Sequence, residues 1–264
     1  MKTQDNILIY DDDCPMCRAY SGAFTRMGLL KKENRVPFHS IPDESFAGKM
    51  DPIKSKNEIP LINLQTGETL YGTEALIEIL SQRWPFFRYF KTNPLLRFLS
   101  RRAYFFVSYN RKVIVPATPK PGSVDCSPSF SLPYRLSFIL MSLILGSVFY
   151  KMAFPHLAYQ NQISIGILAL GIQCIGFLFV KKEKIADYAG NIALLWFLQG
   201  FVLYLTRSVQ SLFHSSFWVL YPGIFMLFCL AHFRRSNLLQ TNMPIQALWL
   251  LNQLLWWALL FQLG

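Results

Sequence analysis

The pattern of apolar and charged positions divides the chain into two halves. Up to about residue 133, charged and apolar residues are mixed as in a soluble α/β domain. From residue 134 onward, charged residues occur only in short stretches between apolar segments. A helix that spans a bilayer needs about 20 residues, so the second half predicts an all-α transmembrane bundle of about five helices. The segments cover about residues 136–154, 163–180, 189–206, 217–233 and 245–263.

Basic residues in the second half gather at the ends of apolar segments. Lys181, Lys182 and Lys184 lie between the second and third segments, and Arg234 and Arg235 lie between the fourth and fifth. Loops rich in Lys and Arg mark the cytoplasmic side of a membrane. We therefore expect an integral, multi-pass membrane protein of the bacterial inner-membrane type, with a cytoplasmic N-terminal domain and the C-terminus outside.

In the first half, short apolar runs predict a β-α-β-β-α core. A strand, a helix and a second strand form a right-handed crossover, which makes the two strands parallel. A turn at residues 65–67 joins two further strands as a hairpin. A tight bend at Gly72 and an N-cap at Thr73 then start a helix that backs the hairpin. Strands are expected at 7–10, 36–41, 59–63 and 69–71, and helices at 15–30 and 74–82.

Aromatic and basic residues alternate between residues 85 and 112, and Pro94 divides this stretch into two short helices. Its apolar face either packs on the preceding domain or lies at a membrane surface, where aromatic side chains suit the headgroup depth. No nucleic-acid recognition motif accompanies the stretch, so no nucleic-acid partner is expected. Residues 115–133, rich in Pro and Ser, form a linker.

The charge and the cysteine content of the chain exclude some classes of partner and site. The net charge of +11 is shared between the halves, with 18 Lys/Arg against 13 Asp/Glu in residues 1–133 and 8 against 2 in residues 134–264. No single acidic partner is therefore implied. Five cysteines in 264 residues do not make a disulfide scaffold, and no secretory signal peptide is visible. One close pair of cysteines then indicates redox or metal chemistry.

That pair is Cys14 and Cys17, which follow three aspartates at the end of the first strand. A helix that starts at Cys14 favours the thiolate there, because unpaired N–H groups and the helix dipole stabilise negative charge. Cys14 would be the exposed attacking thiol, and Cys17 would resolve the mixed disulfide. Zinc needs four ligands, and His39 and Cys126 would complete a set only by a coincidence of folding. We expect no metal.

Pro60 opens the third strand, in the loop expected to face the cysteines. A proline there can follow a cis peptide bond, which would leave the backbone of Ile59 free to pair with a substrate strand. The alternative is a proline that only begins the strand.

The ordered set YDDDCPMC, IPLI and YGTEAL resembles the DCC family of predicted thiol-disulfide oxidoreductases, named for its Asp-Cys-Cys pattern. The stretch from Tyr104 to Arg111 is similar to the end of that family's domain, where a Tyr precedes an Asn-Arg. The resemblance covers about residues 6–128. It implies a thioredoxin-like fold, with Cys14 and Cys17 as the redox pair and Pro60 as the cis-proline.

The resemblance leaves the aspartate of the motif open between Asp11 and Asp13. A carboxylate beside the thiols can shuttle the proton of Cys17 or cap the helix, and we favour capping for Asp13. The net effect of the aspartates on the Cys14 pKa is not fixed by the sequence. Cys126 stands where many family members carry a further cysteine, which makes it a candidate accessory thiol.

Gly72-Thr73-Glu74 resembles the turn where glutaredoxins hold the γ-glutamyl end of glutathione. A helix N-terminus with a hydroxyl suits a carboxylate, so Ile59, Gly72 and Thr73 are candidate substrate-binding residues. Glutathione is a candidate co-substrate, and no resident cofactor is expected. The alternative is an ordinary N-cap at Thr73.

Polar residues inside the apolar segments predict hydrogen bonds between helices. Haem ligation is not expected, because His156 and His214 fall in outer loops and His232 falls at an inner helix end. The polar residues concerned are Gln173, Asn191, Gln199, Asn252 and Gln253.

We predict a redox domain over residues 1–114, a linker over 115–133 and a transmembrane domain over 134–264. The predicted function is thiol–disulfide exchange by a membrane-tethered enzyme that acts on a protein or a small thiol or disulfide. Two alternatives stay open. One is a redox-switched membrane sensor or assembly factor without turnover, and the other is a carrier of small molecules or electrons that the redox domain regulates.

Overall fold

The computed structural model describes residues 6–40, 48–117, 128–155, 159–213, 217–239 and 243–263. The chain divides into two units, Met1–Tyr134 and Arg135–Gly264. This division falls where the composition changes from mixed to strongly apolar. Each unit has its own core of buried side chains.

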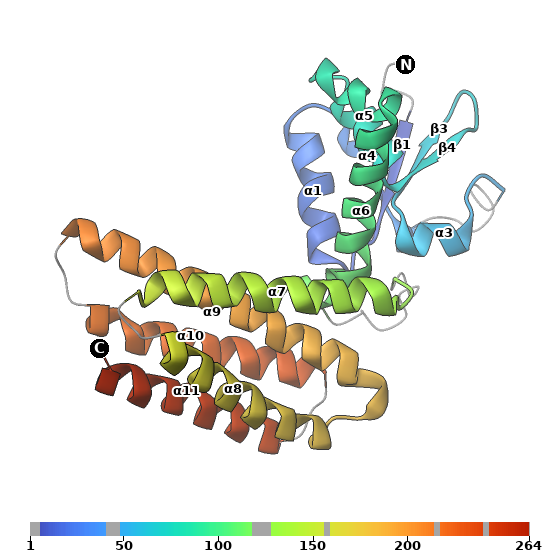
Figure 1. Cartoon of the computed structure of the whole chain (residues 1–264). Helices are drawn as coiled ribbons and strands as arrows, with labels where there is room; N and C mark the ends of the chain where they lie inside the picture. The colour runs from blue at the N-terminus through green and yellow to red at the C-terminus, as the bar shows by residue number, and fades with distance from the viewer. Residues whose placement is uncertain are drawn as a thin grey trace. The chain divides into compact units, whose positions relative to one another are not determined.

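A four-stranded mixed sheet forms the centre of the first unit, in the order β2-β1-β3-β4 (Figure 1). β1 pairs parallel with β2, as the predicted crossover requires, and antiparallel with β3. β3 and β4 form the predicted hairpin. Because β1 and β3 run in opposite directions, the end of β1 and the start of β3 lie at the same edge of the sheet. The strands are β1 Asn6–Tyr10, β2 Arg35–Pro37, β3 Pro60–Asn63 and β4 Thr69–Tyr71.

The second strand is shorter than expected. It ends at Pro37, and a 3-10 turn, η3 over Phe38–Ser40, follows at once. Proline has no N–H to continue the ladder, which explains why the apolar run over residues 36–41 does not stay in the sheet.

Helices of the first unit also depart from the sequence prediction at their ends. The helix after the cysteines stops at Arg26, where Met27 caps it and a turn follows. Pro94 separates two helices, as predicted, but only the first of them is short. The second is a 21-residue helix, with Pro94 in its first turn and the side chain of Asn93 as its N-cap. The helices are α1 Pro15–Arg26, α3 Pro52–Asn57, α4 Gly72–Leu80, α5 Tyr89–Thr92 and α6 Pro94–Ile114, with 3-10 turns η2 Lys32–Asn34 and η4 Pro85–Arg88.

Apolar side chains from the sheet and from the helices α1 and α4 form the core of this unit. Burial of such side chains contributes roughly 1.5–3 kcal/mol each, so this core fixes α1 against β1, the strand that leads into the cysteines. The buried members are Leu8, Tyr10, Phe24, Leu29, Leu30, Ile59, Leu61, Ala75 and Ile79.

The second unit is all-helical in its described residues, and each of the five apolar segments forms a helix (Figure 1). α9 is the longest, and Pro222 lies inside α10. Gly146 lets α7 approach α9 closely, since a Cβ there would lie 2.3 Å from Trp196 Cδ1. The helices are α7 Leu132–Ala153, α8 Tyr159–Gly176, α9 Ile185–Phe213, α10 Phe217–Leu238 and α11 Met243–Leu263, with 3-10 turns η5 Phe177–Phe179 and η6 Lys182–Lys184.

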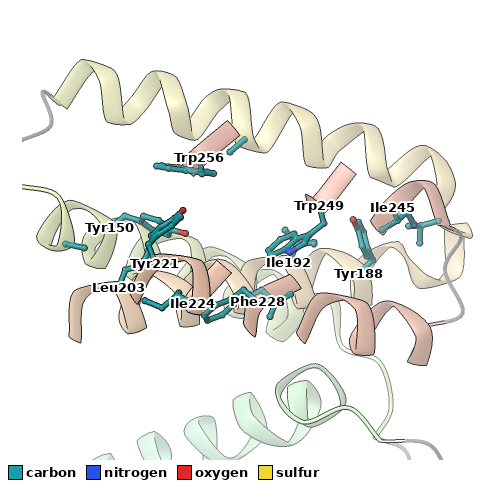
Figure 2. Close-up of a cluster of buried hydrophobic side chains, with 14 residues drawn as sticks. Tyr150, Tyr188, Ile192, Leu203, Tyr221, Ile224, Phe228, Ile245, Trp249 and Trp256 are labelled. Carbon is teal, nitrogen blue, oxygen red and sulfur yellow. The ribbon is translucent and has the colours of Figure 1, made fainter. Parts of the chain in front are cut away.

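Aromatic side chains fill the centre of the helical unit, among them Tyr150, Tyr221 and Trp256 (Figure 2). Polar side chains are buried among them. Gln199 and Gln253 exchange two amide hydrogen bonds of 2.6 and 3.0 Å between α9 and α11. Further bonds join Gln173 to Tyr188 and Asn191 to Arg235. The predicted hydrogen bonds between helices are thus confirmed for Gln173, Asn191, Gln199 and Gln253.

Within the described ranges, two helical stretches are long and apolar enough to cross a membrane, Leu132–Ala153 and Lys182–Val209. The sequence predicted five such spans. The other three segments are helical, but they do not meet the same length and composition test in the residues described.

Candidate active site

Cys14 is the N-cap of α1. Its backbone is extended, with φ −85° and ψ 112°, and Pro15 opens the helix. The Cys17 N–H donates to Cys14 Sγ at 3.4 Å. A sulfur in the cap position therefore receives one of the free N–H groups at the helix start, as an N-cap oxygen normally does. The sequence placed Cys14 at the helix start correctly.

Asp11, not Asp13, organises the loop that joins β1 to α1. Asp11 Oδ1 accepts from the backbone N–H of Asp13 at 3.1 Å and of Cys14 at 3.2 Å. The prediction that Asp13 caps the helix is wrong, because the sulfur of Cys14 takes that position. Of the two aspartates, Asp11 is the one whose carboxylate lies within 4.8 Å of both sulfurs.

The pKa values of the two thiols are shifted in opposite directions. Hydrogen bonding from the Cys17 thiol and N–H lowers the pKa of Cys14 from its ordinary value of 9.0 to about 6, although burial opposes this shift. The same thiol hydrogen bond, together with burial, raises the pKa of Cys17 far above its ordinary range. Near neutral pH, Cys14 is therefore a thiolate and Cys17 is the thiol that donates to it.

Cys14 is also the more exposed of the two cysteines, but both side chains are nearly buried. Cys14 is 9% exposed and Cys17 is 4% exposed. The sequence predicted an exposed attacking thiol, and Cys14 is instead almost covered. The side chain most accessible to a substrate is still Cys14, because Cys17 lies one turn deeper in α1.

Arg111 of α6 joins the aspartate to the cysteines. Its Nη2 donates to Asp11 Oδ2 at 3.0 Å, and its Nη1 lies 3.9 Å from Cys17 Sγ. The same guanidinium donates to the Lys56 carbonyl oxygen at 3.3 Å. Its positive charge lowers the pKa of both Cys14 and Cys17. Burial nevertheless raises the pKa of Asp11 above its ordinary value, despite the ion pair with Arg111.

One stripe of α6 carries Arg111 and two other side chains that fix the site. Tyr104 and Ser108 precede it at helical spacing. Ser108 Oγ donates to the Asn57 carbonyl oxygen at 2.5 Å. The Tyr104 hydroxyl accepts from the Ile59 N–H at 2.9 Å. Burial raises the pKa of Tyr104, so its hydroxyl remains protonated. This stripe ties α6 to the segment that enters β3.

Pro60 lies at the edge of the sheet where β1 ends, as predicted, but the peptide bond before it is trans. The expectation of a cis-proline is therefore wrong for this structure. Both backbone groups of Ile59 are engaged within the chain, since its N–H donates to Tyr104 and its carbonyl oxygen accepts from Gly72 N–H at 2.9 Å. Pairing of a substrate strand with Ile59 would require one of these bonds to break, and stays a prediction.

Gly72 and Thr73 lie in the first turn of α4, where a Cβ on Gly72 would come within 2.7 Å of Glu58 Oε2. Gly72 has a φ of +54° and is the first residue of α4, so Tyr71 and not Thr73 is its N-cap. The predicted N-cap at Thr73 is therefore wrong. Thr73 Oγ1 is buried, and it has no hydrogen-bond partner among the residues that the structure describes.

A metal does not suit the cysteine pair. Asp11, Cys14 and Cys17 place one ligand atom each within 4.8 Å of one another. The Arg111 guanidinium is bonded to Asp11 and lies close to Cys17. A buried positive charge there opposes a divalent cation. His39, the other ligand considered, lies 2.9 Å from Asp12 instead. Cys126, His156 and His214 lie outside the described residues.

Arg111 is the functional residue that spacing around the cysteines does not reveal, because it follows them by more than ninety positions. The signals available were the Asn-Arg pair at the end of the family's domain and the spacing of Tyr104, Ser108 and Arg111 along one helical face. Neither signal assigns a role without the fold. The contact with Asp11 and Cys17 does so.

Comparison with known proteins agrees with this geometry. No curated protein and no solved structure matches the chain significantly. Residues 8–115, which run from β1 to the residue after α6 and include Asp11, Cys14, Cys17 and Arg111, match the model of the DCC1-like thiol-disulfide oxidoreductase family.

Proposed function

We propose that the chain is a membrane-tethered thiol–disulfide oxidoreductase that exchanges disulfides through the Cys14–Cys17 dithiol. The observation that carries this proposal is the asymmetry of the pair. Cys14 has a pKa of about 6 and accepts hydrogen bonds from Cys17, whose own pKa is raised. Attack and resolution need these two different states. The attacking cysteine must be a thiolate, because the thiolate is the nucleophile, and the resolving cysteine must stay protonated until the mixed disulfide has formed.

The reaction begins when the Cys14 thiolate attacks a substrate disulfide, R–S–S–R′. A bond forms between Cys14 Sγ and one substrate sulfur, the substrate S–S bond breaks, and R′–S⁻ leaves. The Cys17 thiol then loses its proton and attacks Cys14 Sγ. The Cys14–Cys17 disulfide forms and R–S⁻ leaves, so two electrons pass from the cysteine pair to the substrate. Two equivalents of a small thiol such as glutathione reverse these steps and regenerate the dithiol.

Asp11 is the proposed acceptor of the Cys17 proton. Its carboxylate lies within 4.8 Å of the sulfurs, and burial raises its pKa above its ordinary value, which favours uptake of a proton. Arg111 holds this carboxylate in place and stabilises the thiolates. Asp13 contributes its backbone N–H to the Asp11 turn, so we assign it a positioning role instead of the capping role expected earlier.

A membrane location is supported by the surface of the helical unit. Large apolar side chains are exposed along its helices, whereas Gln199, Gln253 and Asn252 are buried. A water-soluble bundle rarely exposes so much apolar surface. We propose five crossings over residues 134–264, a linker over 115–133 and a redox domain over 1–114 with a thioredoxin-like fold. The basic loops after α8 and α10 favour a cytoplasmic redox domain.

The proposed partners are the bilayer and a protein or small thiol or disulfide. No nucleic-acid partner and no resident cofactor or metal is proposed. Glutathione is the proposed co-substrate. A substrate disulfide reaches Cys14 at the sheet edge that also carries Ile59 and Pro60, so these residues, with Gly72 and Thr73, are the proposed substrate contacts.

Trapping of mixed disulfides tests the exchange chemistry. In full-length protein, Cys17→Ala removes the resolving thiol, so Cys14 should accumulate mixed disulfides that a reductant releases. The Cys14→Ala/Cys17→Ala variant is the matched control and should trap nothing. Absence of adducts on Cys14 would overturn the oxidoreductase proposal. Adducts with negligible turnover of glutathione disulfide would instead favour a redox-switched sensor.

Protease protection tests the location. In inside-out vesicles, added protease should cleave the redox domain, whereas in right-side-out vesicles the domain should stay intact. The reverse result would contradict the proposed orientation, and release of the whole chain by carbonate at high pH would contradict membrane insertion.

A further inference from the structure

A charged cavity in the first unit lies outside the cysteine site. It has a volume of about 240 Å³ and is lined by residues of α3, β4, α4, α5 and α6. That is room for an amino-acid-sized group and less than the roughly 300–1,000 Å³ of sites for drug-sized ligands. Its polar lining includes Lys54, Glu58, Thr73, Glu74, Lys91 and the α6 arginines 97 and 101.

Two cations of this cavity form ion pairs with carboxylates, and two do not. Arg97 pairs with Glu74 at 2.7 Å, and Lys91 pairs with Glu78, which does not line the cavity. Across the described ranges, neither Lys54 nor Arg101 has a carboxylate within 4 Å. Lys54 lies over the ring of Tyr71 and Arg101 over the ring of Phe105, at 4.2 and 5.6 Å from the ring centroids. Since neither contact uses a carboxylate, both cations can pair with a carboxylate ligand.

The cavity also offers acceptors. Glu58 is half-buried, and burial raises its pKa while Lys54 and Arg101 lower it, so its carboxylate lies within the field of both cations. Thr73 Oγ1 is buried without a hydrogen-bond partner in the part of the chain that the structure describes. A buried polar atom that lacks a partner is uncommon, and a ligand in the cavity would supply one. The lining therefore suits both a carboxylate and an ammonium group.

The cavity adjoins the proposed active site through two connections. Glu58 directly precedes Ile59, whose N–H donates to Tyr104 of α6. Arg101, Tyr104 and Arg111 share one face of that helix. Arg101 and Arg111 are ten residues apart in α6, which is about 15 Å along a helix that rises ~1.5 Å per residue. An arginine side chain shortens this gap by several ångströms.

We infer that this cavity binds the zwitterionic amino-acid end of a peptide-like thiol or disulfide whose sulfur reacts with Cys14. Lys54 and Arg101 bind the carboxylate, and Glu58 and Thr73 accept from the ammonium group. The separation requires about 10 Å between that end and the sulfur, the length of two to three extended residues. Free cysteine is too short. The inference rests on the proposed function for the reacting sulfur, but the binding step does not need exchange.

Binding is tested with S-methylglutathione, which has the zwitterionic end and no free thiol. Titration calorimetry on the full-length protein in nanodiscs should show a saturable heat. Arg101→Gln should weaken Kd about tenfold, the size of one charge-assisted hydrogen bond. Thr73→Ala should weaken it severalfold without a change in charge. Arg83→Gln is the matched control, because Arg83 is exposed and does not line the cavity, and it should bind as the wild type does.

The ammonium contact has its own test. N-acetylation of S-methylglutathione should weaken binding to the wild type about tenfold, and Glu58→Gln should abolish this difference between the two ligands. No binding to the wild type, equal losses in Arg101→Gln and Arg83→Gln, or indifference to acetylation would each overturn the inference.

Kinetics separate this inference from the proposed function. The ratio of the rate constants of reduced protein with glutathione disulfide and with neutral hydroxyethyl disulfide should fall about tenfold in Arg101→Gln. Exchange with both disulfides but no binding of S-methylglutathione would refute the cavity and leave the oxidoreductase. Binding of S-methylglutathione without any exchange at Cys14 would refute the oxidoreductase and leave the cavity.

Discussion

Replacement of Arg111 by glutamine should raise the pKa of Cys14 and make the cysteine pair more reducing. The guanidinium donates to Asp11 at 3.0 Å and lies 3.9 Å from Cys17 Sγ. Its charge lowers the pKa of Cys14, which is about 6. Glutamine keeps a hydrogen-bond donor at nearly the same reach but removes the charge.

The size of the effect follows from Coulomb's law. If the charge is taken at about 5 Å from Cys14 Sγ, in an effective dielectric of roughly 20–40, the interaction is about 1.5–3 kcal/mol, or about one to two pKa units. The Cys14 pKa should then rise from about 6 to about 7–8. At pH 7 the thiolate fraction falls from about 90% to about 10–50%. The reduced state loses about 1 kcal/mol, which shifts the reduction potential by roughly −20 to −30 mV.

Alkylation of the reduced protein measures this shift. The rate of iodoacetamide modification at Cys14, followed by mass spectrometry of its peptide, should titrate at the raised pKa and fall about two- to tenfold at pH 7. Equilibration with glutathione buffers gives the potential. Lys112→Gln is the matched control, because it removes the same charge from the exposed neighbouring residue. Arg111→Lys keeps the charge, so its Cys14 pKa should lie between that of the wild type and that of Arg111→Gln. An unchanged Cys14 pKa in Arg111→Gln, or an equal shift in Lys112→Gln, would refute the reasoning.

Three further predictions concern pH and packing. The pKa of Cys14 in the folded protein is about 6, below its ordinary value of 9.0. Its contribution to the stability of the reduced protein should therefore grow from pH 6 to 9 and be lost as the pH falls through 6. The difference in Tm between the reduced form and the disulfide form, measured across this range, reports the contribution. Gly72→Ala should destabilise the first unit by about 2 kcal/mol, because φ is +54° and a Cβ would lie 2.7 Å from Glu58 Oε2. Gly146→Ala should destabilise the helical unit by about 1–3 kcal/mol in thermal unfolding, because a Cβ would meet Trp196 at 2.3 Å.

Controls for these predictions are available in the same chain. A Cβ at Gly22 or Gly166 would meet no atom within 4 Å, so alanine there should cost little in either unit. Equal Tm losses at these glycines and at the packed ones would contradict the packing argument. A pH dependence in the disulfide form equal to that of the reduced form would contradict the assignment to Cys14. The raised pKa of Cys17 changes stability only above pH 9. A change in stability between pH 6 and 9 therefore reports Cys14.

The local features of the site could be read from the sequence. A strand, a Cys-x-x-Cys pair and a helix opened by Pro15 placed Cys14 at the N-cap, because these constraints act within a few residues. The crossover rule gave the parallel pairing of β1 and β2. In the second half, apolar runs located all five helices, since long apolar segments bounded by charges leave few alternatives.

Contacts between distant segments could not be read in the same way. The sequence did not choose between Asp11 and Asp13, because both stand beside the cysteines and only the turn geometry directs Asp11 toward the sulfurs. It also favoured a cis bond before Pro60, whereas the bond is trans and both backbone groups of Ile59 are engaged with Tyr104 and Gly72. Local residue choice permits these states, and the packing of α6 and α4 selects among them.

The sequence by itself therefore determined the cysteine pair, its place at a helix start and the division into a mixed and an apolar half. These features depend on residue type and on interactions over one or two helical turns. Only the tertiary structure brought Arg111 from α6 to Asp11 and Cys17, and only it assembled the cavity of Lys54, Glu58 and Arg101. Charges so far apart in the chain act on one another only after folding has brought them within a few ångströms, because Coulomb interactions over longer distances are screened in water.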